Sequence, residues 1–138
     1  MSEQENIDAV KKGYEAFGRG DIPGLLMQLD ANVSWVAFGP ADLPTAGAWR
    51  GHPGVTEFFQ QLASIVDITR FETKEFIAQG DRVVVIGEGT EKVKATGRAF
   101  EFQFAHVFSV RDGKIVSFVD YVDVSAVVSE LRGVRAQV

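Results

Sequence analysis

The sequence predicts an α+β domain with a mostly antiparallel sheet. Helical patterns occupy the first half of the chain, and consecutive strand patterns follow from about Thr69 onward. Early helices followed by late strands favour a layer of helices packed on one face of a sheet. The chain has 138 residues, 46% hydrophobic and 24% charged, so it can bury one core, and we expect a single domain over residues 1–138.

Two helical patterns open the chain. The first begins at Ser2, which forms a capping-box pattern with the glutamate three residues later, and ends at the glycines of segment 18–21. Its apolar residues recur at helical spacing: Ile7, Val10, Tyr14 and Phe17. Asp21 is expected to cap a second helix that ends around residues 30–32. We expect a strand over residues 33–38 and then a long loop rich in glycine, proline and alanine.

A third helix and four strands complete the expected order. Pro53 suits a first helical turn, and the apolar residues after it fall on one stripe: Val55, Phe58, Phe59, Leu62 and Ile65. Strands are expected over residues 70–78, 81–93, 98–110 and 115–123. A short helix over residues 125–131 is expected to close the chain.

Segment 100–108 places phenylalanine at alternate positions, and His106 interrupts the row. Alternate residues of a strand share one face, so the imidazole shares the buried face with the phenyl rings. An unpaired polar ring there costs about 1–3 kcal/mol, so His106 needs a partner, a ligand or a hydrated cavity.

The turn after this strand decides which side chains His106 meets. A two-residue turn on Asp112-Gly113 sets even-numbered residues beside odd-numbered ones and leaves Phe118 on the polar face. A three-residue turn on 111–113, with Gly113 left-handed in a bulge, pairs even with even and buries the phenylalanines consistently. We therefore expect the three-residue turn, which places Asp120 on the buried face as a diagonal neighbour of His106.

Two interpretations of His106 and Asp120 remain open. The pair can be a buried hydrogen-bonded contact that fixes the strand register. Alternatively, two titratable groups that converge on an apolar face can handle protons in an active site.

Composition disfavours several classes of partner. Lys and Arg total 14 against 19 Asp and Glu, for a net charge of −5, and the cations are scattered, so we expect no nucleic-acid binding. No apolar run approaches the roughly 20 residues that span a bilayer, and the N-terminus is acidic, so we expect no membrane association and a cytoplasmic protein. The absence of cysteine and the wide spacing of the two histidines make a metal site unexpected.

Four phrases in this order carry a resemblance to a known family: YEAFGRGDIPGLLMQLDANVSW, WRGHPGVTEFF, GDRVVV and HVFSVRDGKIVSFVDYVD. Together they resemble the SnoaL-like and ketosteroid-isomerase-like branch of the NTF2-like superfamily. The resemblance implies a cone in which three N-terminal helices pack on a strongly curved, mostly antiparallel sheet around a deep apolar pocket. It also implies a homodimer formed through the outer sheet face.

The resemblance favours one branch of this superfamily. Its polyketide cyclases use an aspartate on the last strand as acid and base, with a histidine on the strand before, and Asp120 and His106 fall at these places. The base aspartate of the steroid isomerases would fall at Trp35, which cannot accept a proton. Their oxyanion-binding tyrosine would lie close to Tyr14, although the spacing is a residue short. Steroid isomerisation is therefore disfavoured.

These observations predict acid/base chemistry, of isomerase, cyclase or hydrolase type, on a hydrophobic carbonyl-bearing or polycyclic small molecule. Asp120 would remove or return a proton at carbon, His106 would orient it, and Tyr14 would donate a further hydrogen bond, with no cofactor needed. Tyr14 also lies on an apolar helical stripe, which predicts a core position for its ring. The expected pocket wall consists of Trp35, Phe58, Phe59, Leu62, Phe104 and Phe118. The alternative is a non-catalytic module that binds an apolar ligand or packs as a dimer, which a cone filled by side chains would favour.

Overall fold

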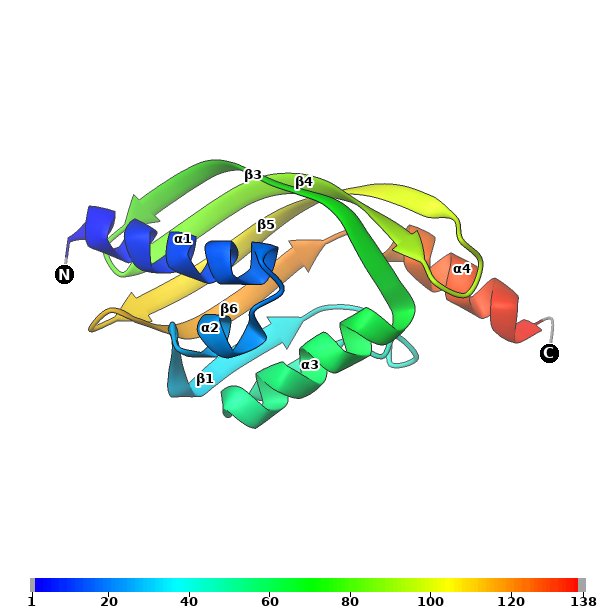
Figure 1. The fold of residues 1–138 in the computed structure, drawn as a ribbon, viewed down its shortest axis with the longest axis horizontal. Helices are drawn as coiled ribbons and strands as arrows, with labels where there is room; N and C mark the ends of the chain where they lie inside the picture. The colour runs from blue at the N-terminus through cyan, green and yellow to red at the C-terminus, as the bar shows by residue number, and fades with distance from the viewer. Residues whose placement is uncertain (1, 137–138) are drawn as a thin grey trace.

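The computed structural model describes residues 2–136, which form four helices and one six-stranded sheet (Figure 1). The helices are α1 (Glu3–Gly18), α2 (Ile22–Leu26), α3 (Gly51–Ile65) and α4 (Ser125–Ala136). The strands are β1 (Leu29–Ala37), β2 (Gly47–Arg50), β3 (Val66–Gln79), β4 (Arg82–Val93), β5 (Ala99–Arg111) and β6 (Lys114–Val122). The predicted α+β class is confirmed.

The sheet is strongly curved and mostly antiparallel. Its strand order is β2-β1-β6-β5-β4-β3, and β1 with β6 is the parallel pair among the described strands. Figure 1 shows β3 and β4 arching over α1, while α3 crosses the open side and α4 lies at the far end of the sheet from the start of α1. The helices α1 to α3 therefore cover the concave face, as the sequence predicts.

Glycines in β4 and irregularities in β3 accompany this curvature. Rings of β5 cover Gly87 and Gly89, and a Cβ atom at either position would overlap the ring of Phe104 or Phe102. In β3 the register against β4 shifts at two places, which locally increases bending and twist. Phenyl rings can therefore lie flat against the concave floor of the sheet.

Helix α1 begins and ends as its sequence predicts. The Ser2 side chain accepts a hydrogen bond from the Glu5 amide, and the Glu5 carboxylate accepts one from the Ser2 amide, which completes a capping box. Val10 is buried against the sheet, and Tyr14 one turn later reaches β5. The cap and the apolar stripe thus fix which side chains α1 presents to the concave face.

The turn between β5 and β6 differs from the prediction, and so does the exact pairing: Asp120 shares the buried face with His106 as predicted, but it lies directly opposite His106 rather than diagonal to it. Arg111 pairs with Lys114, so the turn has two residues, and both Asp112 (φ 50°) and Gly113 (φ 78°) are left-handed. A bulge at Val116 then shifts the register between Ser109 and Val110. The extra residue restores even-with-even pairing. The even-with-even register of a three-residue turn would place Val116 on the buried face, whereas in the structure Val116 occupies the bulge.

Other predicted boundaries shift because of long-range pairing. Helix α2 ends at Leu26 rather than at residues 30–32, since Leu29 already pairs with Ile115 in the sheet. The short strand β2 lies where the sequence predicts a loop, and it pairs with β1. Strand β3 begins at Val66, directly after α3.

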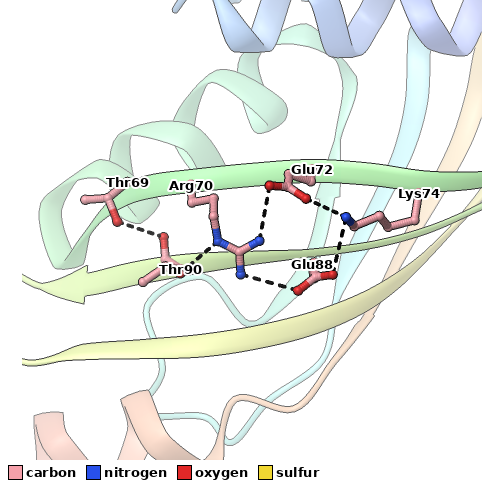
Figure 2. A network of polar contacts seen from close by, with 6 residues as sticks. All are labelled: Thr69, Arg70, Glu72, Lys74, Glu88 and Thr90. Carbon is pink, nitrogen blue, oxygen red and sulfur yellow. Dashed lines mark hydrogen bonds and ion pairs between the residues drawn. The ribbon is translucent and has the colours of Figure 1, made fainter.

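The outer sheet face carries a network of charged residues on β3 and β4 (Figure 2). Glu72 and Glu88 are cross-strand partners, an arrangement that destabilises a sheet when the two charges are unpaired. The Arg70 guanidinium lies 3.4 Å from each carboxylate, and Lys74 Nζ lies 2.6 Å from Glu72 and 3.6 Å from Glu88. The hydrogen bond and charge of Lys74, together with those of Arg70, lower the pKa of Glu72.

Apolar side chains adjoin this network on the outer face. They lie on rungs shared by the central strands: Val84, Ile86, Ala105, Val107 and Val119. Tyr121, which is 51% exposed, packs against Phe38 at the edge of these residues, with ring centroids 5.5 Å apart. We call this set, with Tyr121 and Phe38, the outer apolar face.

Candidate functional site

Tyr14, His106 and Asp120 lie in one line of contacts. His106 and Asp120 are direct cross-strand partners on β5 and β6. His106 Nδ1 lies 2.7 Å from the Tyr14 hydroxyl, and His106 Nε2 lies 3.1 Å from Asp120 Oδ1. The structure thus brings together the three residues that the sequence analysis proposes as catalytic, with α1 supplying one and the sheet supplying two.

Protonation within this line follows from burial. Burial, together with the charge of Asp120, raises the pKa of Tyr14 well above its usual range, so the hydroxyl keeps its proton. The hydroxyl can then donate to His106 Nδ1, which places the imidazole proton on Nε2, the atom that faces Asp120. Tyr14 therefore sets the tautomer of the histidine that contacts the carboxylate.

Two buried polar atoms near this line lack a hydrogen-bond partner among the described residues. Asp120 Oδ1 lies close to His106 Nε2, but the ring N–H is not aligned with it, so the contact has the distance of an ion pair without the geometry of a hydrogen bond. Trp35 Nε1 is the other, on a residue that is only 4% exposed. An acceptor and a donor thus remain free on neighbouring strands β6 and β1.

A cavity of about 150 Å³ adjoins these residues. Its lining includes the three proposed catalytic residues and the whole predicted wall: Trp35, Phe58, Phe59, Leu62, Phe104 and Phe118. An apolar cavity near 150 Å³ holds a benzene-sized ring, whereas drug-sized ligands need roughly 300–1,000 Å³. The cavity therefore has room for one ring without movement of side chains.

Aromatic stacking holds the imidazole in place. Phe104 stacks on His106 with ring centroids 4.0 Å apart, and Phe118 meets the same ring edge-on at 4.8 Å. Trp35 in turn stacks on Phe118 at 3.9 Å. Since each ring is packed on another, the side chain of His106 has little freedom to rotate away from Tyr14 and Asp120.

Glu91 is a lining residue that the sequence analysis missed. It lies on the inward face of β4, and burial, together with the charge of Asp120, raises its pKa. The segment DRVVVIGEGTEKV contains the signal that could have revealed it, since Val83, Val85 and Val93 have the same parity as Glu91. Because side chains alternate between the two faces of a strand, this pattern places the Glu91 carboxyl on the apolar face.

The loop after β1 and helix α4 close one end of the cavity, which the sequence analysis also missed. Leu43 and Val127 line the cavity from these two segments. The Asp42 carboxylate accepts two hydrogen bonds of 2.9 and 3.0 Å from Arg132 and one of 2.9 Å from Arg135, which donates another of 2.9 Å to the Asp42 carbonyl oxygen. The hydrogen bond from Arg132 is the main cause that lowers the pKa of Asp42 to about 2. These contacts, which we call the Asp42 clasp, join α4 to the loop.

Two features are absent from residues 2–136. No cluster of three or more histidine, cysteine or acidic side chains lies close enough to hold a metal ion in this part of the chain. Across the same residues, each helix is too short or too polar to cross a membrane.

Proteins of known structure resemble the chain along nearly its whole length. An NTF2-like protein from Burkholderia xenovorans LB400 is 39% identical, over 94% of this chain and 97% of that chain, with a TM-score of 0.82. TerC, crystallised with polyporic acid, is 34% identical over 88% of this chain and 94% of its own, with a TM-score of 0.79. A proposed SnoaL-like polyketide cyclase from Mesorhizobium loti is 17% identical over 83% and 97%, with a TM-score of 0.68, and shows the fold alone. The comparison with curated proteins found no match.

The family model for the SnoaL-like domain matches residues 10–118. This span includes Tyr14 and His106 and ends two residues before Asp120, so the place of Asp120 rests on the strand pairing described above. The match covers most of the chain, and its structural relatives have the NTF2-like fold. The chain therefore belongs to the SnoaL-like family of NTF2-like proteins.

Proposed function

We propose that this protein is an enzyme that moves a proton at carbon in a hydrophobic carbonyl compound. One observation carries the proposal: the Tyr14–His106–Asp120 line ends at a cavity whose other walls are almost entirely apolar. An apolar cavity with a few converging polar groups is the usual form of a small-molecule site.

Each residue of the line has a defined task. The Asp120 carboxylate accepts a proton from the carbon beside the carbonyl, and the electron pair of the broken C–H bond moves to the carbonyl oxygen as an enolate. The Nε2 proton of His106 lies beside Asp120, where it stabilises negative charge, and the Tyr14 hydroxyl holds the imidazole in that tautomer. Return of the proton to another carbon gives isomerisation, and attack of the enolate on a second carbonyl of the same molecule gives cyclisation.

The ligand class is supported by the lining and by one relative. Stacked aromatic walls favour flat, ring-bearing compounds, and the volume of about 150 Å³ favours a single ring or the inserted end of a larger molecule. TerC, a relative that is 34% identical to this chain, was crystallised with polyporic acid, which is a small organic molecule.

Proton exchange at carbon tests the proposal without knowledge of the natural substrate. 2-Tetralone carries acidic protons on the carbons beside its carbonyl group. In heavy water these protons are replaced by deuterium, and NMR follows the rate of replacement. The protein is expected to accelerate this exchange, and Asp120→Asn is expected to reduce the acceleration at least about a hundredfold, the typical contribution of a general base.

Asp112→Asn is the matched control, because Asp112 lies in the exposed turn and asparagine adopts its left-handed backbone readily. An exchange rate equal to that of buffer, for 2-tetralone and for cyclohexanone, would contradict the proposed reaction. So would equal acceleration by wild type and Asp120→Asn.

A second candidate is the non-catalytic module. The cavity volume favours it, since about 150 Å³ lies below the range of most ligand pockets. On that account the buried line serves packing and register, and the protein does not accelerate deuterium exchange in 2-tetralone. A rise in the melting temperature with 2-tetralone would then distinguish a module that binds an apolar ligand from one that only packs as a dimer.

A further inference from the structure

We propose that Glu91 is a specificity residue that accepts a hydrogen bond from a hydroxyl group of the ligand. The inference rests on the proposed function in one respect, namely that the cavity beside Asp120 receives a ligand. It adds a substrate class, a carbonyl compound that also bears a hydroxyl group remote from the reacting carbon.

Strand pairing places Glu91 far from His106 along the sheet but on the same concave face. Glu91 pairs with Phe100, whereas Val85 pairs with His106, so six residues of β5 separate the two rungs. That separation is about 20 Å along a flat strand. Both residues nevertheless line one cavity, and Figure 1 shows that the sheet is strongly curved.

Glu91 has no hydrogen bond or ion pair to any side chain among residues 2–136. Its cross-strand partners are Ile68 and Phe100, which are both apolar. Lys92, the next residue on β4, is exposed on the opposite face of the strand. Lys94 lies 3.6 Å from Asp67 and Arg98 lies 3.2 Å from Glu130, so both have other partners. The carboxyl is therefore available to a group that enters the cavity.

A purely structural role explains Glu91 poorly. The same face of β4 bears Val83, Val85 and Val93, each fully buried, so an apolar side chain would fit the pattern of the strand. Burial raises the pKa of Glu91, which means that the folded chain disfavours the ionised form. A residue that opposes stability in an apolar site is expected where it contacts a ligand.

The ligand would span the two polar places in the cavity. Four titratable residues line it, Tyr14, His106 and Asp120 in one group and Glu91 alone. The carbon that loses its proton lies at the first group, and the apolar body of the ligand rests on rings of β5. A hydroxyl group at the other end of the ligand then donates to the Glu91 carboxylate.

A panel of tetralones tests the inference. The dissociation constant is measured by calorimetry for 2-tetralone and for its 5-, 6-, 7- and 8-hydroxy derivatives. At least one hydroxy derivative is expected to bind wild type about tenfold more tightly than 2-tetralone, as one hydrogen bond to a charged group provides. Glu91→Leu is expected to remove this preference, and Glu101→Gln, on the exposed outer face of β5, is the control that retains it.

The outcomes separate this inference from the proposed reaction. In Asp120→Asn the hydroxyl preference is expected to persist while deuterium exchange is lost. If exchange fails but the preference is present and depends on Glu91, the proposed reaction is wrong and the role of Glu91 stands. The role of Glu91 is wrong if no hydroxy derivative gains affinity, if the gain survives Glu91→Leu, or if no tetralone binds. Melting temperatures of both variants verify that they are folded.

Discussion

His106 and Asp120 face each other across neighbouring strands, and the imidazole is fixed on its other side by the hydroxyl of Tyr14. The line crosses from the sheet to α1 at the wall of the cavity. The contact between Nε2 and Oδ1 is close but poorly aligned, so it lacks the geometry of a hydrogen bond.

The stability of Asp120→Asn is the first prediction. Its free energy of unfolding is expected to change by about 1 kcal/mol or less, because little hydrogen-bond energy is present to be lost. Urea denaturation of wild type, Asp120→Asn, His106→Phe and the double variant measures this. A loss of about 3 kcal/mol or more in Asp120→Asn, relieved in the double variant, would show a structural pair instead.

Tyr14→Phe is expected to lower the free energy of unfolding by about 1 kcal/mol, since His106 Nδ1 loses its donor. The raised pKa of Tyr14 adds a pH dependence. The contribution of the protonated Tyr14 hydroxyl to stability is complete below pH 10.0, the pKa in the unfolded chain. It is lost as the pH rises toward the higher pKa in the folded chain. Above pH 10.0, the free energy of unfolding of wild type should therefore fall more steeply with pH than that of Tyr14→Phe.

The second tyrosine of the chain supplies the control for that experiment. Tyr121 is half exposed on the outer face of the single chain, so Tyr121→Phe should retain the alkaline slope when both are compared in the monomeric Val107→Glu background described below. Equal slopes in wild type and Tyr14→Phe would contradict the burial of the Tyr14 hydroxyl.

Glu91→Gln is expected to stabilise the fold at neutral pH. The pKa of Glu91 in the folded chain is raised above the usual 4.5. The protonated carboxyl therefore makes its full contribution to stability below pH 4.5, and this contribution is lost as the pH rises through the pKa of the folded chain. The advantage of the variant should therefore shrink on acidification. Thermal melting from neutral pH to below 4.5 measures it, and a variant less stable than wild type at neutral pH would indicate an unseen partner of Glu91.

Asp42→Asn is expected to loosen α4. In wild type the lowered pKa of Asp42 means that the clasp contributes fully above 3.8 and is lost as the pH falls toward about 2. Hydrogen exchange of the α4 amides should rise in the variant at neutral pH, with exchange in β5 unchanged. Asp67→Asn is the control, because it removes an ion pair with Lys94 elsewhere in the fold. Equal hydrogen exchange of the α4 amides in both variants would show that the Asp42 clasp does not stabilise α4.

The outer apolar face is expected to form a homodimer. Its central valines are only half-buried in the single chain, and the charged network on β3 and β4 would lie at the rim, as in most protein interfaces. Light scattering should give twice the chain mass of 15.1 kDa, and Val107→Glu should give a monomer. Lys74→Ala is the control at the rim, and a wild-type mass of one chain at high concentration would contradict the prediction.

The sequence by itself determined the features that depend on neighbouring residues. The capping box of Ser2 and Glu5 and the cap at Asp21 are local hydrogen bonds, so both helix starts could be predicted. The alternation around His106 is equally local, because the period of a strand fixes which residues share a face. These patterns were sufficient for the α+β class.

Tertiary structure decided what depends on contacts between distant segments. The bulge at Val116 and the two-residue turn at Asp112 set even-numbered residues opposite even-numbered ones, as predicted, but place Asp120 directly opposite His106 rather than diagonal to it. The alternative turns differ little in the free energy of strand pairing, so the local sequence does not choose between them. Strand β2 forms only because β1 offers it an edge. The contact of Tyr14 with His106 and the cavity beside Glu91 depend on how far the sheet curves over α1, and no local pattern encodes that curvature.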